Sequence, residues 1–168
     1  MTQTDVVVYC NAYWAGCRNK HKPTSCYAVF LCENLVSRSS KRQNTVSRSS
    51  TEAKYCVMAN AVGEATWLCQ LLLELCSPLR SATLVYYDNI KTFYICYNPV
   101  QHKCTKHIEI DLHFICERVA IVDVSVLHLP TSSWCADVFT KGLPSSVFSE
   151  FRASLNIRGH DDQATGVC

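Results

Sequence analysis

Four polar residues that follow predicted strands or lie in predicted helices could together form one site: Asn11, Lys54, Asp88 and Asp137. The carboxyl ends of parallel strands in an open α/β sheet are where ligands and catalytic groups gather. Carboxylate and amide oxygens suit a hard ion such as Mg²⁺, but only Asp88 and Asp137 are acidic. The residue types alone leave two interpretations open: a catalytic magnesium site, or turn-capping Asx residues beside a surface lysine.

Two short apolar strands must position Asn11 and Asp88. The runs DVVVY at residues 5–9 and ATLVYY at residues 82–87 are continuous and β-branched or aromatic, which is typical of buried strands. Asn11 and Asp88 follow these runs. A long helix between two such strands predicts a crossover unit with parallel strands, whose carboxyl ends point the same way.

The helix that connects the two strands is predicted at residues 49–75. Its apolar residues recur at three-, four- and seven-residue spacings, which predicts one core-facing stripe: Val57, Ala61, Leu68, Leu72 and Leu75. Ser49 followed by Glu52 fits a capping box at its start, and Ser77-Pro78 predicts its end. Lys54 therefore lies in the first turns of this helix.

The remaining elements complete a mixed α/β pattern. Residues 25–31 and 34–37 are predicted as strands that form an antiparallel meander with the first strand. Further predictions are helices at 90–97, 106–119, 134–141 and 145–155, and a last strand at 123–129.

A basic segment links the meander to the long helix. Residues 38–50 are rich in serine and contain no acidic residue, while their cations are Arg38, Lys41, Arg42 and Arg48. The plainer interpretation is a solvated loop, and the functional one is a rim that contacts the phosphates of a nucleic acid.

Composition limits the class of protein. A chain of 168 residues, 48% of them hydrophobic, is long enough for one domain with a core. The formal net charge of +2 does not by itself imply nucleic acid or membrane. Without a long apolar run or a signal-peptide pattern, we expect an intracellular protein with no membrane partner. The twelve cysteines include no C-x-x-C pair, so we expect mostly buried thiols and no zinc site.

Five motifs occur in order along the chain: CNAYWAG at 10–16, TVSRSSTEAKY at 45–55, YYDN at 86–89, NPVQHKCTKHIEIDLHF at 98–114 and ADVFTKGLP at 136–144. Together they resemble the ribonuclease H domain of copia-type LTR retrotransposon polyproteins, particularly those of plants. The resemblance implies an α/β, ribonuclease H-like fold over residues 1–156. Its five-stranded mixed sheet would combine a three-strand antiparallel meander with parallel strands, flanked by helices, and residues 157–168 would be a disordered tail.

The resemblance also implies a function and its machinery. Members of the family hydrolyse the RNA strand of RNA–DNA hybrids, using four carboxylates that hold two magnesium ions. They do so within a polyprotein that also carries reverse transcriptase and integrase. The partner implied for this chain is thus an RNA–DNA hybrid or another nucleic acid.

The family carboxylates can be assigned residue by residue, and two of the four are replaced. The family usually reads D-A-D-W-A-G where this chain has Asn11 first, and T-E-A-E-Y where this chain has Lys54 in place of the second glutamate. Asp88 and Asp137 match the family and would be the retained metal ligands. Two unit charges about 4 Å apart interact by roughly 4 kcal/mol at an effective dielectric near 20. Replacing a carboxylate by an ammonium group therefore turns a large attraction for a metal ion into a repulsion of similar size. We therefore predict a degenerate domain that is inactive or severely impaired.

Cysteines support sequence decay. Members of the family resembled here have arginine at four positions where this chain has cysteine: Cys56, Cys69, Cys104 and Cys116. Each of these changes can follow from a single base transition, as can the changes from aspartate to Asn11 and from glutamate to Lys54. Cys26 and Cys32 stand where the family often has glycine, which predicts strained turns. Two other hypotheses remain: a non-catalytic module in which Lys54 contacts a phosphate, aided by the four cations of the basic segment, and a product without selected function.

Overall fold

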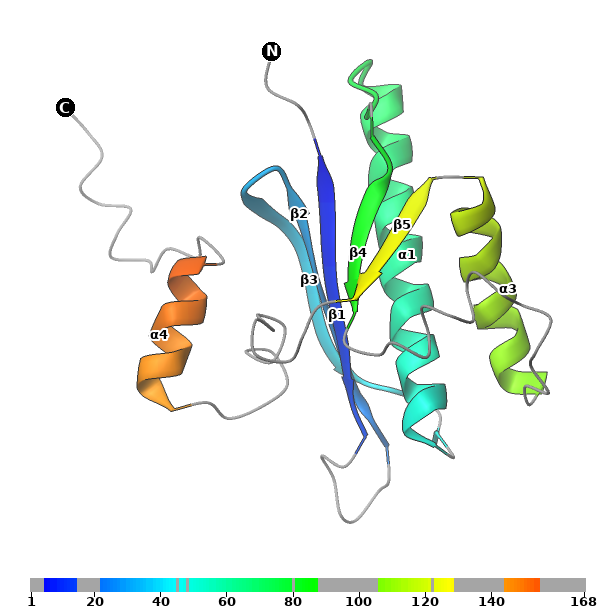
Figure 1. Ribbon diagram of the computed structural model, residues 1–168, viewed down its shortest axis with the longest axis vertical. Helices are drawn as coiled ribbons and strands as arrows, with labels where there is room; N and C mark the ends of the chain where they lie inside the picture. The colour runs from blue at the N-terminus through cyan, green and yellow to red at the C-terminus, as the bar shows by residue number, and fades with distance from the viewer. Residues whose placement is uncertain are drawn as a thin grey trace.

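The computed structural model describes residues 5–14, 22–44, 46–47, 49–79, 81–87, 106–121, 123–128 and 144–154. Its five strands are β1 (Val6–Tyr13), β2 (Thr24–Leu31), β3 (Asn34–Arg42), β4 (Thr83–Tyr87) and β5 (Val124–His128). They form one sheet in the order β3-β2-β1-β4-β5 (Figure 1). β1 is antiparallel to β2 and β2 to β3, whereas β4 is parallel to both β1 and β5. The predicted five-stranded mixed sheet and the parallel crossover are confirmed.

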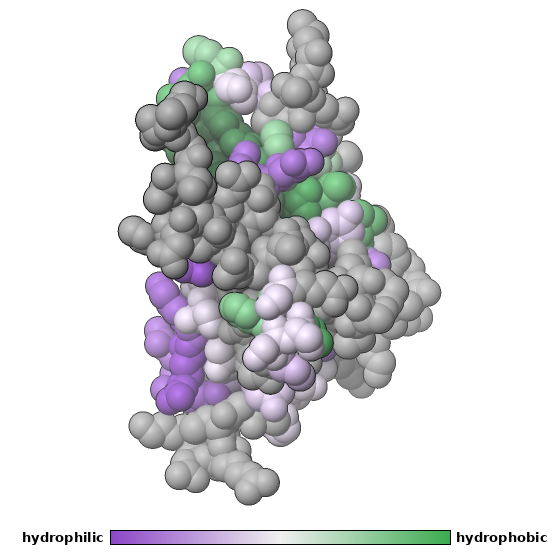
Figure 2. Space-filling model, turned by 90° about the vertical axis from the view of Figure 1, so that its left-hand side faces the viewer, coloured by the Kyte–Doolittle hydropathy of each residue, from purple (hydrophilic) through white to green (hydrophobic). Residues whose placement is uncertain are grey.

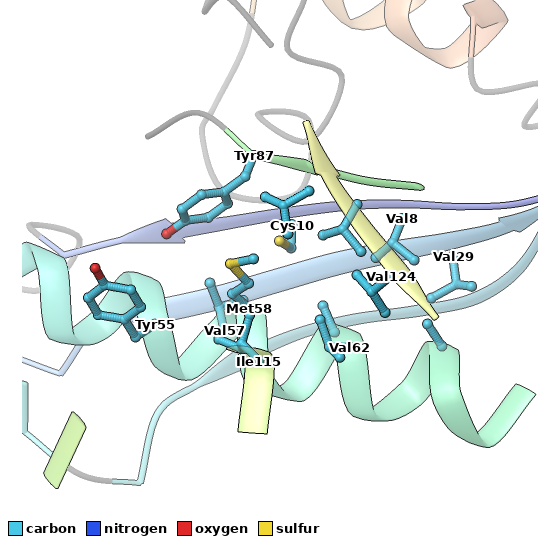
Figure 3. Close-up of a cluster of buried hydrophobic side chains, with 14 of the residues drawn as sticks. Val8, Cys10, Val29, Tyr55, Val57, Met58, Val62, Tyr87, Ile115 and Val124 are labelled. Atoms are coloured by element: carbon cyan, nitrogen blue, oxygen red, sulfur yellow. The ribbon is translucent and has the colours of Figure 1, made fainter. Parts of the chain in front are cut away.

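The described helices are α1 (Ser50–Glu74), α3 (Lys106–Ala120) and α4 (Ser145–Ser154). α1 packs along β1 and β2, and α3 contacts α1 and β5 (Figure 1). The core lies between α1 and the sheet: Val57, Met58 and Val62 of α1 point toward Val8 and Cys10 of β1 (Figure 3). α1 has the length and apolar composition of a membrane span, but core helices meet the same criterion, and its apolar side chains contact this sheet.

Both ends of α1 follow from local chemistry. The Ser49 hydroxyl is the N-cap and accepts a hydrogen bond from the backbone N–H of Glu52 at 3.1 Å. At the other end, Cys76 N–H donates to the Leu73 carbonyl and Ser77 N–H to the Leu72 carbonyl, which is a Schellman motif. The predicted helix is confirmed, although one member of its predicted core stripe is wrong, because Leu75 is the C-cap and is 66% exposed.

Two strands are longer than predicted. β1 continues to Tyr13 because β2 pairs with it as far as Tyr13↔Thr24, and β3 continues to Arg42 because Thr24 of β2 pairs with that residue. The loop interpretation of residues 38–42 is therefore wrong, since this half of the basic segment is an edge strand.

Other predictions meet mixed outcomes. The helix and strand predicted at 106–119 and 123–129 are confirmed as α3 and β5, and the helix at 145–155 as α4. The helices predicted at 90–97 and 134–141, and the tail at 157–168, lie outside the described residues. Of the cysteines whose surroundings are described, only Cys10 and Cys26 are buried, so mostly buried thiols were the wrong expectation for this part of the chain. Cys32 has φ 55°, the left-handed conformation that favours glycine, as predicted for a strained turn. The same prediction is wrong for Cys26, because Cys26 lies inside β2 and pairs with residues of both β1 and β3.

Candidate functional site

The Lys54 side chain reaches the carboxyl end of β4. Its Nζ atom lies 6.0 Å from the centroid of the Tyr87 ring, within the range of a cation–π contact. Tyr87 is the last residue of β4, and Asp88 follows it directly in the sequence, outside the described residues. Consecutive Cα atoms are about 3.8 Å apart. The structure thus brings an ammonium group to the strand end where the sequence predicted a site.

Asn11 lies near the carboxyl end of β1, beside the carboxyl end of β4, but its side chain is on the other face of the sheet. It is 5% exposed and lies between Cys10 and Ala12, which pack in the core under α1, so alternation along β1 points Asn11 away from α1. Tyr9, two residues earlier, pairs with Tyr86 of β4. Asn11 and Lys54 therefore lie near the carboxyl ends of β1 and β4, on opposite faces of the sheet. Asp137 and Arg48, like Asp88, lie outside the described residues.

Gln43 fixes the start of α1, although it is not among the residues predicted for the site. Its Nε2 donates to the Ser25 hydroxyl at 2.6 Å and to the Ala53 carbonyl at 2.9 Å, while its Oε1 accepts from the Ser47 hydroxyl at 2.9 Å. Gln43 and Ser47 are both buried. Ala53 precedes Lys54, so this network ties β2 and the linker to the helical turn that carries the lysine. A single glutamine in a polar segment gives no sequence signal of burial.

The predicted basic rim is divided between two faces of β3. Lys41 pairs with Ser25, and both line a cavity of about 450 Å³ on the α1 side. Arg38 instead pairs with Ala28, which belongs to the cluster on the opposite face. The cavity is lined by Ser25, Tyr27, Ser39, Lys41, Arg42, Gln43, Asn44, Cys56, Asn60 and Glu64.

Titratable groups near α1 have perturbed pKa values. Burial raises the pKa of the Asp111 carboxyl on α3. Burial also raises the pKa of the Cys56 thiol, and the negative charge of Asp111 adds to this effect. For Tyr27, burial and then the charge of Glu64 raise the pKa of the hydroxyl. The main cause of all three pKa shifts is burial where α1 packs against the sheet and α3.

A metal site does not assemble from the part of the chain that the structure describes. No group of three or more His, Cys, Asp or Glu side chains there could hold an ion. At the candidate edge, the described donors are the neutral amide of Asn11 and the cationic Lys54. An ammonium group repels a divalent cation, so these residues do not fit a two-magnesium centre.

Comparison with known proteins gives relatives in sequence and in fold, although no family model matches. The chain is 40% identical over 149 residues to the retrovirus-related Pol polyprotein from transposon RE1 of Arabidopsis thaliana, a match that covers 89% of this chain and 10% of the relative. The polyprotein from transposon RE2 of the same plant matches over the same shares, also at 40% identity. The chain thus spans about a tenth of the length of these curated relatives.

The structural comparison agrees. LC11-RNase H1, isolated from compost by a metagenomic approach, superposes with a TM-score of 0.60 at 15% identity, covering 80% of this chain and 91% of that one. The prototype foamy virus protease–reverse transcriptase gives a TM-score of 0.51 at 13% identity, over 99% of this chain and 21% of that one. At such identities the likeness concerns the fold, and it confirms the ribonuclease H-like architecture.

Proposed function

We propose that this chain, which is homologous to a segment of plant retrotransposon Pol polyproteins and has the ribonuclease H-like fold, is a ribonuclease H-type domain that has lost hybrid cleavage. The observation that carries the proposal is the position of the Lys54 ammonium, 6.0 Å from the ring of the residue that ends β4. The domain would comprise residues 1–156 and act inside the cell.

The loss follows from charge. Catalysis by two metal ions requires ligands that compensate the positive charge of both ions and place them on the attacking and leaving oxygens. At a separation of about 4 Å and an effective dielectric near 20, exchanging a carboxylate for an ammonium changes one charge pair by about 8 kcal/mol. Asn11 adds a second loss, because an amide oxygen can coordinate an ion but contributes no charge. Asp88 and Asp137 alone would bind Mg²⁺ weakly.

Cleavage of a labelled RNA–DNA hybrid in magnesium tests the proposal. The unmodified chain should leave the hybrid intact, whereas Asn11→Asp with Lys54→Glu should raise cleavage by at least about tenfold, which corresponds to 1.4 kcal/mol in the barrier. A matched control is Asn34→Asp with Lys106→Glu, because it makes the same two substitutions at the first residue of β3 and the first residue of α3. Robust cutting by the unmodified chain would refute the loss of activity.

A second candidate function is binding of nucleic acid without cleavage. Lys54 at the strand edge and the exposed cations of β3 favour it, since backbone phosphates dominate such affinity. LC11-RNase H1, whose fold this chain shares, has also been solved in complex with an RNA/DNA hybrid, with a TM-score of 0.52 to this chain. The expected signature is magnesium-independent binding that weakens with salt and with Lys54→Ala. A chain with neither binding nor a cooperative unfolding transition would instead be a product without selected function.

A further inference from the structure

We propose that β3 is a docking edge for an extended acidic peptide segment of another protein, which would join the sheet as an additional strand. In the part of the chain that the structure describes, β3 pairs with β2 on one side and with no strand on the other. The outer N–H and C=O groups of an edge strand lie in the plane of the sheet, and an extended peptide can pair with them in a regular ladder. The side chains of β3 then decide which peptide fits.

The charges of β3 favour an acidic partner. Its nine residues include no acidic residue and three exposed cations, Arg38, Lys41 and Arg42. Arg38 pairs with Ala28, which belongs to the cluster on the face away from α1, and Arg42, four residues later, points to the same face. Residues four apart on a strand are separated by about 13 Å, and an extended peptide repeats at the same spacing. Two carboxylates of one peptide can therefore face the two arginines.

The α1 side of β3 favours different side chains. α1 packs along β1 and β2, and the cavity of about 450 Å³ lies between α1 and β3. Lys41 and Glu64 both line this cavity, and Glu64 Oε1 accepts a hydrogen bond from the Ser37 hydroxyl at 2.7 Å. Because a cation and a carboxylate lie on the same face, it does not select a charged side chain. Short polar residues such as threonine suit this face of the peptide, whereas glutamates suit the face with the two arginines.

Burial of apolar side chains would contribute little to this contact. The last three residues of β3 are exposed and polar: Ser40, Lys41 and Arg42. The side view in Figure 2 shows hydrophilic side chains gathered in a band at the lower left of the molecule, while most of the hydrophobic ones lie higher. Backbone hydrogen bonds and charge pairs would therefore supply the affinity, so the binding should be weak and should decline with salt.

Fluorescence anisotropy with a labelled peptide of alternating glutamate and threonine, about nine residues long to match β3, tests the proposal. The chain should bind this peptide at low salt. Arg38→Gln with Arg42→Gln should weaken binding about tenfold, since each exposed ion pair changes affinity by up to about fivefold. Lys41→Gln is the matched control, because it removes a cation of the same strand from the face that also carries Glu64, and it should weaken binding by less than about twofold.

A second peptide separates ladder pairing from plain charge attraction. N-methylation of two adjacent central residues keeps every side chain and charge. Because successive N–H groups of a strand point to opposite edges, it removes one N–H directed at β3 in either register, and binding should weaken at least about fivefold. The unmethylated peptide should also slow hydrogen exchange of β3 amides and leave that of α3 amides unchanged.

Several results would overturn the proposal. Equal binding of the two peptides would show that β3 attracts polyanions in general, nucleic acid included. Absence of binding, or a loss from Lys41→Gln as large as that from the double arginine variant, would also contradict it. Thermal unfolding of each variant confirms that it is folded. Because neither cleavage nor Lys54 enters these measurements, they stand apart from the test of lost activity.

Discussion

Replacing Gln43 should destabilise the fold out of proportion to the size of the change. Gln43→Ala removes three hydrogen bonds and strands the hydroxyl of Ser47, which is 4% exposed and donates to Gln43 Oε1. A buried polar group left without a partner costs about 1–3 kcal/mol, and truncating a buried side chain adds to that cost. We expect a loss of about 2–3 kcal/mol in the free energy of unfolding, or roughly 4–12 °C in Tm for a domain of this size.

Urea denaturation monitored by tryptophan fluorescence measures this loss, and three variants isolate its cause. Gln43→Met keeps the volume but not the hydrogen bonds, so it should retain most of the destabilisation. Gln70→Ala, which truncates an exposed glutamine on α1, should change stability by less than about 0.5 kcal/mol.

The double variant Gln43→Ala with Ser47→Ala discriminates further. Because Ser47→Ala removes the stranded hydroxyl, the double variant should lose less stability than the sum of the two single variants. Strict additivity, or a Gln43→Met variant as stable as the unmodified chain, would refute the argument that this network holds the start of α1.

Two more substitutions are expected to stabilise the chain. Cys32→Gly should raise the free energy of unfolding, measured in urea, by about 0.5–1 kcal/mol. Cys32 has φ 55°, a left-handed conformation that costs an L-residue about 1–2 kcal/mol, and the greater chain entropy of unfolded glycine offsets part of this gain. Cys32→Ala, which keeps the Cβ atom, should show no such gain. Burial raises the pKa of Asp111, so the folded state binds its proton more tightly than the unfolded state and stability from this group falls as pH rises through its titration. Asp111→Asn should therefore stabilise the chain more at pH 7 than near pH 3.5, and an equal effect at both pH values would contradict the raised pKa.

The sequence predicted the elements that carry strong local signals. α1 has a capping serine, a periodic apolar face and a stop, and each of these acts within a few residues. The predicted ends of β1 and β3 were wrong because each strand continues as far as its pairing with β2 continues. That register is set between strands and is not visible in the residues of either strand alone. Polar residues such as Lys41 and Arg42 enter a strand here because its partner reaches that far.

The candidate site was predictable only as a set of positions. Motif resemblance placed Lys54 at a family carboxylate, but its contact with Tyr87 depends on how α1 crosses the sheet. The same holds for the two faces of β3, where the register separates Arg38 from Lys41 although both are basic and close in the chain. The Gln43 network depends on three segments meeting, which no local pattern encodes.

The position of β3 at the edge of the sheet also bears on how the chain behaves at high concentration. An edge strand offers its outer backbone to strands of other molecules, and charged side chains, lysine especially, discourage such pairing. Arg38, Lys41 and Arg42 are exposed along this strand, so mutual repulsion opposes the joining of two sheets edge to edge. The cations of β3 thus protect the chain against self-association and aggregation, whether or not they bind a ligand.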